Sequence, residues 1–86
     1  MTSITLLTAP GCHLCEQAKE VLHRLTPEYG LAVDTVELGS DQGRRLASDA
    51  GIVFPPGVLI EGRPFSYGRL SERKLRRELG RATHRV

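Results

Sequence analysis

The order of apolar and amphipathic segments predicts a single α/β domain, in which helices cover both faces of a four-stranded mixed sheet. The segments follow one another as β-α-β-α-β-β-α. The first strand, helix and second strand predict a parallel pair with a right-handed crossover, and the later hairpin adds an antiparallel edge. Apolar residues make up 40% of the 86 residues, which is enough for one small core.

The first half of the chain predicts strand, helix and strand. Residues 4–8 form a short apolar run, rich in β-branched residues, that ends at Ala9-Pro10-Gly11. Residues 12–25 repeat apolar side chains at helical spacing, and we expect this helix to close at Pro27 and Gly30. Residues 31–38 alternate in part and predict the second strand.

A short second helix and a hairpin are predicted next. Ser40 or Asp41 caps the helix and Gly51 stops it, while Gly43 inside it weakens the prediction. After an irregular segment, residues 58–60 form a strand, Glu61-Gly62 a hairpin turn, and residues 63–67 a last strand. Pro64 places that strand at the edge of the sheet.

The chain is predicted to close with a basic helix. Ser71 is its N-cap, and Leu75, Leu79 and Ala82 form its buried stripe. We predict one domain over residues 1–86. Gly80 is expected to end the helix early, so residues 81–86 are predicted to be a flexible basic tail.

Two cysteines carry the chemistry that the sequence suggests. Cys12 and Cys15 are the only cysteines, in Gly11-Cys12-His13-Leu14-Cys15, where the first strand passes into the first helix. The start of a helix presents unpaired N–H groups and the positive end of the dipole. This field favours a thiolate, which is the nucleophilic form of cysteine, so the motif predicts thiol–disulfide chemistry.

The pair has two other possible interpretations, a zinc site and two inert buried cysteines. A C-x-x-C pair is half of many zinc sites, but only His13, His23 and His84 are available as further nitrogen ligands. A closed zinc site within one chain is therefore disfavoured and no metal is predicted, although a site shared between two chains stays open. Two inert buried cysteines are also disfavoured, because a cysteine after a glycine at a helix start is poorly placed for a core.

Charge is unevenly distributed along the chain, whose net charge is +2. Residues 1–62 carry four Lys or Arg and eight Asp or Glu, whereas residues 63–86 carry eight and two. The basic part is either a solvated helix face or a docking surface for an acidic protein partner. Nucleic-acid binding is disfavoured, because no aromatic stacking platform or DNA-reading motif accompanies the charge.

The sequence also predicts a compartment. Residues 1–3 carry none of the basic side chains that begin a secretory signal peptide. No apolar stretch approaches the length of a membrane span. We therefore expect a cytoplasmic protein without a membrane partner. In the cytosol, a lone C-x-x-C pair is usually catalytic or redox-sensing.

The element order, the C-x-x-C pair at the start of the first helix and the proline before the third strand resemble the thioredoxin superfamily, and at this length its glutaredoxin-like branch. The resemblance implies that Cys12 attacks a disulfide and Cys15 resolves the mixed disulfide. It also implies a cis-proline facing the cysteines. Pro55 and Pro56 compete for this place, and the distance to the hairpin turn favours Pro56.

Further residues are assigned to substrate binding by the same resemblance. Pro55 would stand where the family pairs its backbone with the substrate, yet it has no N–H to offer. Phe54 supplies an apolar wall or belongs to the core. His13 either adds positive charge beside Cys12 or is an exposed spacer. Tyr67 either stacks on a ligand or covers the sheet edge.

The chain departs from its relatives around the cysteines. No basic residue precedes Cys12, Ser66-Tyr67-Gly68 replaces the usual Gly-Gly segment, and tryptophan is absent. The function predicted is a dithiol–disulfide oxidoreductase acting on protein or low-molecular-weight disulfides without a bound cofactor. Its external reductant is left open between glutathione, another thiol and a thioredoxin-reductase-type donor. The alternative is a redox-sensing or protein-binding module without turnover.

Overall fold

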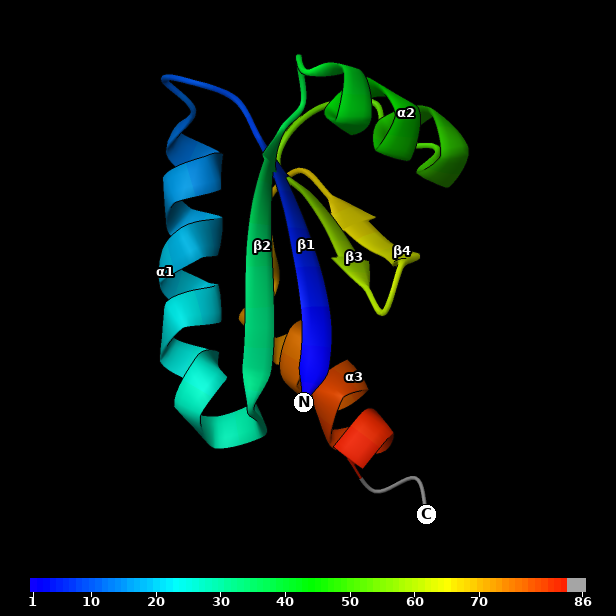
Figure 1. The fold of residues 1–86 in the computed structure, drawn as a ribbon. Coiled ribbons are helices and arrows are strands. Elements are labelled where there is room, and N and C mark those ends of the chain that lie inside the picture. The colour runs from blue at the N-terminus through cyan, green and yellow to red at the C-terminus, as the bar shows by residue number, and fades with distance from the viewer. Residues whose placement is uncertain (84–86) are drawn as a thin grey trace.

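The chain folds in the predicted order of strands and helices (Figure 1). The structure is a computed structural model that describes residues 1–83, and its side chains are described through residue 81. The elements are β1 (Thr2–Thr8), α1 (His13–Tyr29), β2 (Leu31–Glu37), α2 (Asp41–Ala50), β3 (Gly57–Ile60), β4 (Arg63–Tyr67) and α3 (Glu72–Thr83).

The sheet has the strand order β2-β1-β3-β4. β1 pairs in parallel with β2 and antiparallel with β3, and β3 pairs antiparallel with β4. The predicted turn joins β3 to β4, with φ angles of 52° at Glu61 and 79° at Gly62. Two consecutive residues in this left-handed region match the twist of a tight hairpin. β4 lies at an edge of the sheet, as Pro64 predicts.

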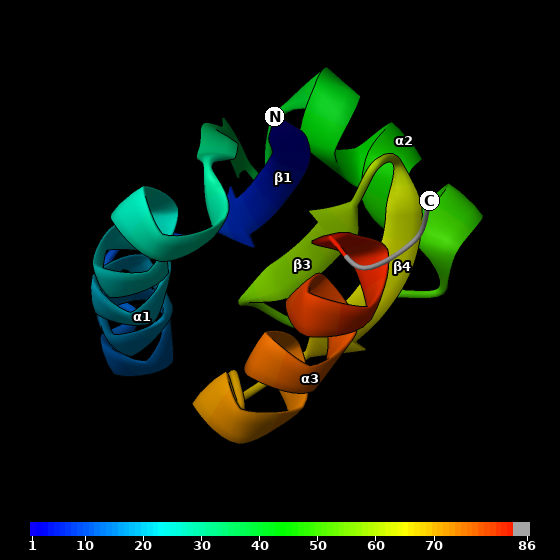
Figure 2. The ribbon, with the colours of Figure 1, turned by 90° about the horizontal axis from the view of Figure 1, so that it is seen from below.

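Helices cover both faces of the sheet (Figure 2). α1 and α3 pack on one face around a cluster that includes Leu6, Leu22 and Leu75, all at most 1% exposed. α2 packs on the other face, where Ala47 meets a smaller cluster. Successive residues of a strand point to opposite faces of the sheet, so β1 contributes side chains to both clusters.

α2 is held close to the end of β2 by two small features. The N–H of Gly43 donates to the Ser40 hydroxyl at 3.0 Å, so Ser40, one of the two predicted candidates, is the cap. A Cβ at Gly43 would overlap the carbonyl oxygen of Glu37 and lie 2.9 Å from the Cα of Leu38. Glycine at this helical position therefore permits close packing of α2 on the backbone after β2.

α1 runs past the predicted stop at Pro27. Proline has no N–H, so Pro27 removes one hydrogen bond from the last turn of α1. The helix nevertheless continues, and the N–H of Gly30 donates to the carbonyl of Thr26 at 2.8 Å. The hydroxyl of Thr26 also donates to the carbonyl of Leu22 at 2.7 Å. The extra turn brings Tyr29 against the core, and the helix ends at Gly30 in the left-handed conformation.

α3 continues beyond Gly80, so the predicted start of a tail at residue 81 is wrong. Gly80 does not have the positive φ that ends α1 and α2 at Gly30 and Gly51. Arg81 makes an ion pair with Glu78, one turn earlier, at 3.6 Å. The rest of the predicted tail, residues 84–86, and the side chain of Ala82 lie outside the part that the structure describes.

Four charged side chains join α1 to α3. Glu72 accepts from Arg24 at 2.6 Å and from Arg76 at 3.0 Å, and Arg76 also binds Glu28 at 2.7 Å. The charges alternate in sign along this chain of contacts. These hydrogen bonds hold the pKa of both carboxyl groups, Glu28 and Glu72, below the ordinary value.

The cysteine motif and the ends of the described chain lie at opposite ends of the sheet. The end of β1, the start of α1 and the start of β3 lie together at one end (Figure 1). The start of β1 and the end of α3 lie at the other. The cysteine motif is thereby separated from both ends of the described chain.

Candidate redox-active site

Cys12 and Cys15 form a disulfide at the start of α1, with their Cα atoms 5.2 Å apart. Gly11 has a φ of 66°, which turns the chain out of the β1–α1 loop. Cys12 is the N-cap residue, with extended backbone at φ −106° and ψ 109°. The predicted position of the pair, at a strand-to-helix junction, is therefore confirmed.

The sulfur of Cys12 occupies the capping position of α1. It accepts a hydrogen bond from the backbone N–H of Cys15 at 3.1 Å. In most helices an oxygen of Ser, Thr, Asp or Asn satisfies this N–H. A negatively charged sulfur would receive the same bond together with the field of the helix dipole.

The two sulfur-bearing residues differ in access. Cys12 is partly exposed, whereas Cys15 is only 1% exposed and packs with the core. His13, between them, is exposed at the first position of α1. An incoming disulfide would therefore reach Cys12 before Cys15.

The two prolines lie at the same end of the sheet as the cysteines. The Pro55–Pro56 peptide bond is cis, in agreement with the preference for Pro56. Pro56 is fully buried, and its carbonyl accepts the N–H of Gly68 at 2.9 Å. The next residue, Gly57, pairs with Leu7 of β1, one residue before the end of that strand.

An aromatic pair continues this end of the sheet. The rings of Phe54 and Tyr67 meet edge to face, with their centroids 5.0 Å apart and their planes at 84°. Phe54 is 50% exposed and Tyr67 is 45% exposed, so neither is a core residue. Tyr67 pairs with Gly57 in the sheet, which connects the aromatic pair to the proline segment.

Gln17, two residues after Cys15, and Ser66 in β4 each carry a buried polar atom that the sequence did not reveal. The side-chain amide of Gln17 donates to the carbonyl of Leu70 at 3.2 Å and so ties α1 to the β4–α3 loop. Within the described residues, its Oε1 is buried without a hydrogen-bond partner, as is the hydroxyl of Ser66. A glutamine two residues after the motif carries no distinguishing signal in one sequence.

The sequence matches the family described as "Glutaredoxin-like domain (DUF836)" over residues 3–80. The chain belongs to this glutaredoxin-like family. An uncharacterized protein of Mycobacterium tuberculosis is 32% identical over 83 residues, which cover 93% of this chain and 84% of that protein. A protein of Archaeoglobus fulgidus named "Probable Thioredoxin" is 28% identical over 76 residues, covering 88% and 84% respectively.

Solved structures agree on the fold of this glutaredoxin-like chain. A mutant thioredoxin from Halobacterium salinarum superposes with a TM-score of 0.76 at 21% identity, covering 99% of this chain and 77% of that one. Thioredoxin O2 from Arabidopsis thaliana, in its oxidized state, gives 0.71 at 15%, covering 94% and 74%. The predicted thioredoxin-like fold and its C-x-x-C pair at disulfide distance are thus confirmed.

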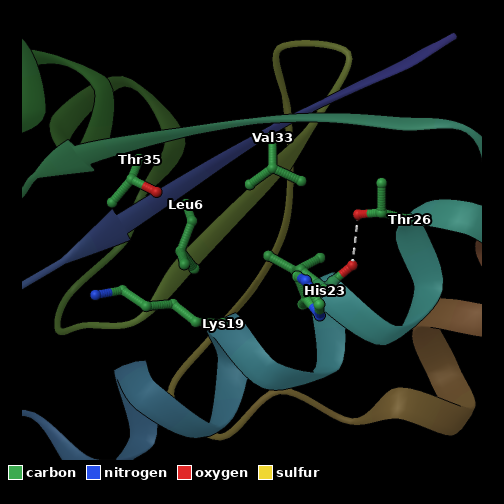
Figure 3. A pocket seen from close by; sticks show the side chains of 7 residues that line it. Leu6, Lys19, His23, Thr26, Val33 and Thr35 are labelled. Atoms are coloured by element: carbon green, nitrogen blue, oxygen red, sulfur yellow. Dashed lines mark hydrogen bonds between the residues drawn. The ribbon is translucent and has the colours of Figure 1, made fainter.

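A pocket of the glutaredoxin-like chain has neither cysteine in its lining (Figure 3). This pocket of about 220 Å³ opens between α1 and β2, where Leu6 and Val33 contribute apolar walls. Lys19 and His23 of α1 also line it, while the Thr26 hydroxyl is engaged with the carbonyl of Leu22.

Within residues 1–83, no group of three or more His, Cys, Asp and Glu side chains is arranged to hold a metal ion. His84, one of the histidines weighed as a zinc ligand, lies outside that range. In the same range no helix has the length and apolar character needed to cross a membrane.

Proposed function

We propose that this glutaredoxin-like protein is a dithiol–disulfide oxidoreductase, with Cys12 as its nucleophile and Cys15 as its resolving residue. The observation that carries the proposal is the asymmetry of the pair. The Cys12 sulfur is accessible and accepts a helix N–H at 3.1 Å, whereas Cys15 is buried directly behind it. Access and thiolate stabilisation both favour attack by Cys12.

The reaction proceeds in two exchanges. The Cys12 thiolate attacks one sulfur of a substrate disulfide, the substrate S–S bond breaks, and the first substrate thiolate leaves and takes a proton from water. Cys15 then loses its proton to water and attacks the Cys12 sulfur, which releases the second substrate thiol. Two electrons pass to the substrate, and the protein is left with the Cys12–Cys15 disulfide.

Substrate binding is proposed at the proline segment and at His13. Pro56 and Pro55 lie at the cysteine end of the sheet, and half-exposed Phe54 offers an apolar wall beside them. His13 lies between the cysteines and is exposed, so its side chain is available to contact a substrate bound at Cys12.

The dithiol must be regenerated by an external thiol reductant, either glutathione, another small thiol or a thioredoxin-reductase-type donor. No bound cofactor is needed, because the electrons are stored in the cysteines themselves. We place this cycle in the cytoplasm, where thiol pools keep a lone cysteine pair available as a catalyst rather than as a permanent crosslink.

The reduction potential of the Cys12–Cys15 pair tests this proposal. The protein would be equilibrated in a dithiothreitol or glutathione redox series, and the two forms counted by intact mass after alkylation. A reversible two-electron transition between roughly −270 and −180 mV, the span of thioredoxin-like catalysts, is expected. A disulfide that resists reduction throughout that range would point to a structural crosslink.

A second candidate function is a protein-binding module without turnover, and one observation favours it. Four exposed basic side chains on and before α3 form no ion pair within the described residues: Arg69, Arg73, Lys74 and Arg77. A surface of this kind suits an acidic protein partner. Replacing Arg73 and Arg77 by glutamine would then abolish partner binding, while the Cys12–Cys15 pair would still be oxidised and reduced as in the parent protein.

A further inference from the structure

We propose that the physiological substrate is a polypeptide disulfide with an apolar side chain next to its cysteine, which docks on the apolar platform formed by Val53, Phe54 and Tyr67. This inference rests on the proposed function and specifies its substrate class. Four observations support it: the platform is exposed, its side chains are held in place, the neighbouring prolines have no backbone N–H to donate, and few cations lie around Cys12.

Exposed apolar side chains are concentrated at the platform. Five large hydrophobic side chains are exposed among the described residues, and three of them are Val53 at 73%, Phe54 at 50% and Tyr67 at 45%. The other two, Met1 and Val33, lie on other parts of the chain. Single exposed hydrophobic residues are ordinary, but a group of them commonly marks a binding surface.

Contacts around the two aromatic rings of the platform hold them in a fixed position. The rings of Phe54 and Tyr67 support each other edge to face at 5.0 Å. Gly68 leaves room for Phe54, because a Cβ there would lie 3.1 Å from its ring. The N–H of Gly68 donates to the carbonyl of Pro56, which fixes the loop that carries Phe54 to the end of β4. Rigid aromatic side chains lose little entropy when a ligand covers them.

The backbone of this segment cannot replace the platform. Pro55 and Pro56 have no N–H to donate to an extended substrate. The carbonyl of Pro56 already accepts from Gly68. Two consecutive residues at the cysteine end of the sheet therefore offer no main-chain donor, which leaves a larger share of the recognition to side-chain contact.

A small anionic disulfide finds few partners here. Residues 8–11, directly before Cys12, carry no charge. Exposed Arg69 is the cation closest in sequence to the platform, and the acidic side chain of Glu16 lies in the first turn of α1. Such a charge distribution favours an uncharged, apolar neighbour of the target cysteine over a carboxylate-bearing tripeptide thiol.

The test compares matched substrates on the full chain. Two disulfide-linked peptides that differ only in leucine or serine beside the cysteine are reduced by the dithiol protein, together with glutathione disulfide and bis(2-hydroxyethyl) disulfide. We expect the leucine peptide to react at least about tenfold faster than the serine peptide and than glutathione disulfide.

Two valine variants locate the preference. Val53→Ser should reduce the ratio of the two peptide rates about fivefold, because it removes an apolar contact at a position that is 73% exposed and hence tolerant of the change. Val33→Ser is the matched control on β2, at the other edge of the sheet, and it should leave the ratio as it is in the parent protein.

The possible outcomes separate the two proposals. Equal rates for the two peptides, faster reduction of glutathione disulfide, or an equal effect of both valine variants would overturn the substrate inference while leaving the oxidoreductase in place. Failure to reduce all four disulfides, bis(2-hydroxyethyl) disulfide included, would overturn the oxidoreductase proposal and the substrate inference with it.

Discussion

The backbone N–H of Cys15 donates a hydrogen bond to the sulfur of Cys12 at 3.1 Å. In the proposed reaction, the buried cysteine would therefore act on the accessible one through its main chain as well as through its thiol. A substitution at residue 15 that keeps the helix also keeps this N–H. The two contributions of Cys15 are therefore experimentally separable.

Replacement of Cys15 by serine should trap substrates on Cys12. The attacking sulfur keeps its capping N–H, but no second thiol is present to release the mixed disulfide. Intact mass spectrometry after exposure to a peptide disulfide should show one stable adduct per chain. Cys12→Ser, the matched control, should give little adduct because Cys15 is buried. Equal trapping by both variants would contradict the assigned order of attack.

The thiol of Cys12 should ionise more readily than an ordinary cysteine. The N–H of Cys15 and the dipole of α1 both stabilise its thiolate, so we expect a pKa below about 8.5, the value of a free thiol. The thiolate absorbance of reduced Cys15→Ser, followed against pH, isolates this group. A midpoint at or above the ordinary value would show that the helix start does not activate Cys12.

Folding stability should decrease in acid through the ion-pair network between α1 and α3. Hydrogen bonds from Arg76 to Glu28, and from Arg24 and Arg76 to Glu72, hold the pKa of both carboxyl groups below the ordinary 4.5. A lowered pKa in the folded state contributes stability above 4.5 that is lost as the pH falls through the folded value.

Thermal unfolding between about pH 7 and about pH 3 measures this effect. Glu72→Gln should flatten the lower part of the profile, because it removes one of the two titrating groups. High salt should also weaken the dependence, since these side chains are substantially exposed. An unchanged profile in the variant would exclude Glu72 as a source of acid sensitivity.

Two helical glycines should respond in opposite directions to the same substitution. Gly43→Ala should destabilise the fold by about 1–3 kcal/mol, because its methyl group would overlap the backbone carbonyl of Glu37. Gly80→Ala should stabilise α3 by about 0.5–1 kcal/mol, because within the described part of the chain no atom outside the neighbouring residues and the backbone of α3 itself lies within 4 Å of that Cβ position. Urea unfolding of both variants would decide, and a stable Gly43→Ala would show that α2 can move away from β2.

Local signals in the sequence were sufficient to predict most of the strands, helices and turns. Ser40 and Ser71 cap α2 and α3 as their side chains predict, and Glu61-Gly62 forms the hairpin turn. The cysteine pair and Pro56 also lie where their spacing places them. Capping and turn residues act over a few neighbouring positions, which is why one sequence is enough to identify them.

The errors arose where tertiary packing decides. Of the two residues predicted to close α1, Gly30 ends the helix and Pro27 does not, because one more turn packs the partly buried Tyr29 against the core. Gly80 did not end α3, whereas Gly43 proved to be a packing position in α2 rather than a weakness. The contact between Phe54 and Tyr67 joins residues from different loops, so no local pattern could reveal it.

Both ends of the described chain lie opposite the cysteine motif, as Figure 1 shows. A fluorescent label, an affinity handle or a linker to an electrode could therefore be attached beside the start of β1 without crowding Cys12. Immobilised in this way, the molecule would present its disulfide outward. Its electron transfer could then be recorded directly, with no coupled enzyme in the assay.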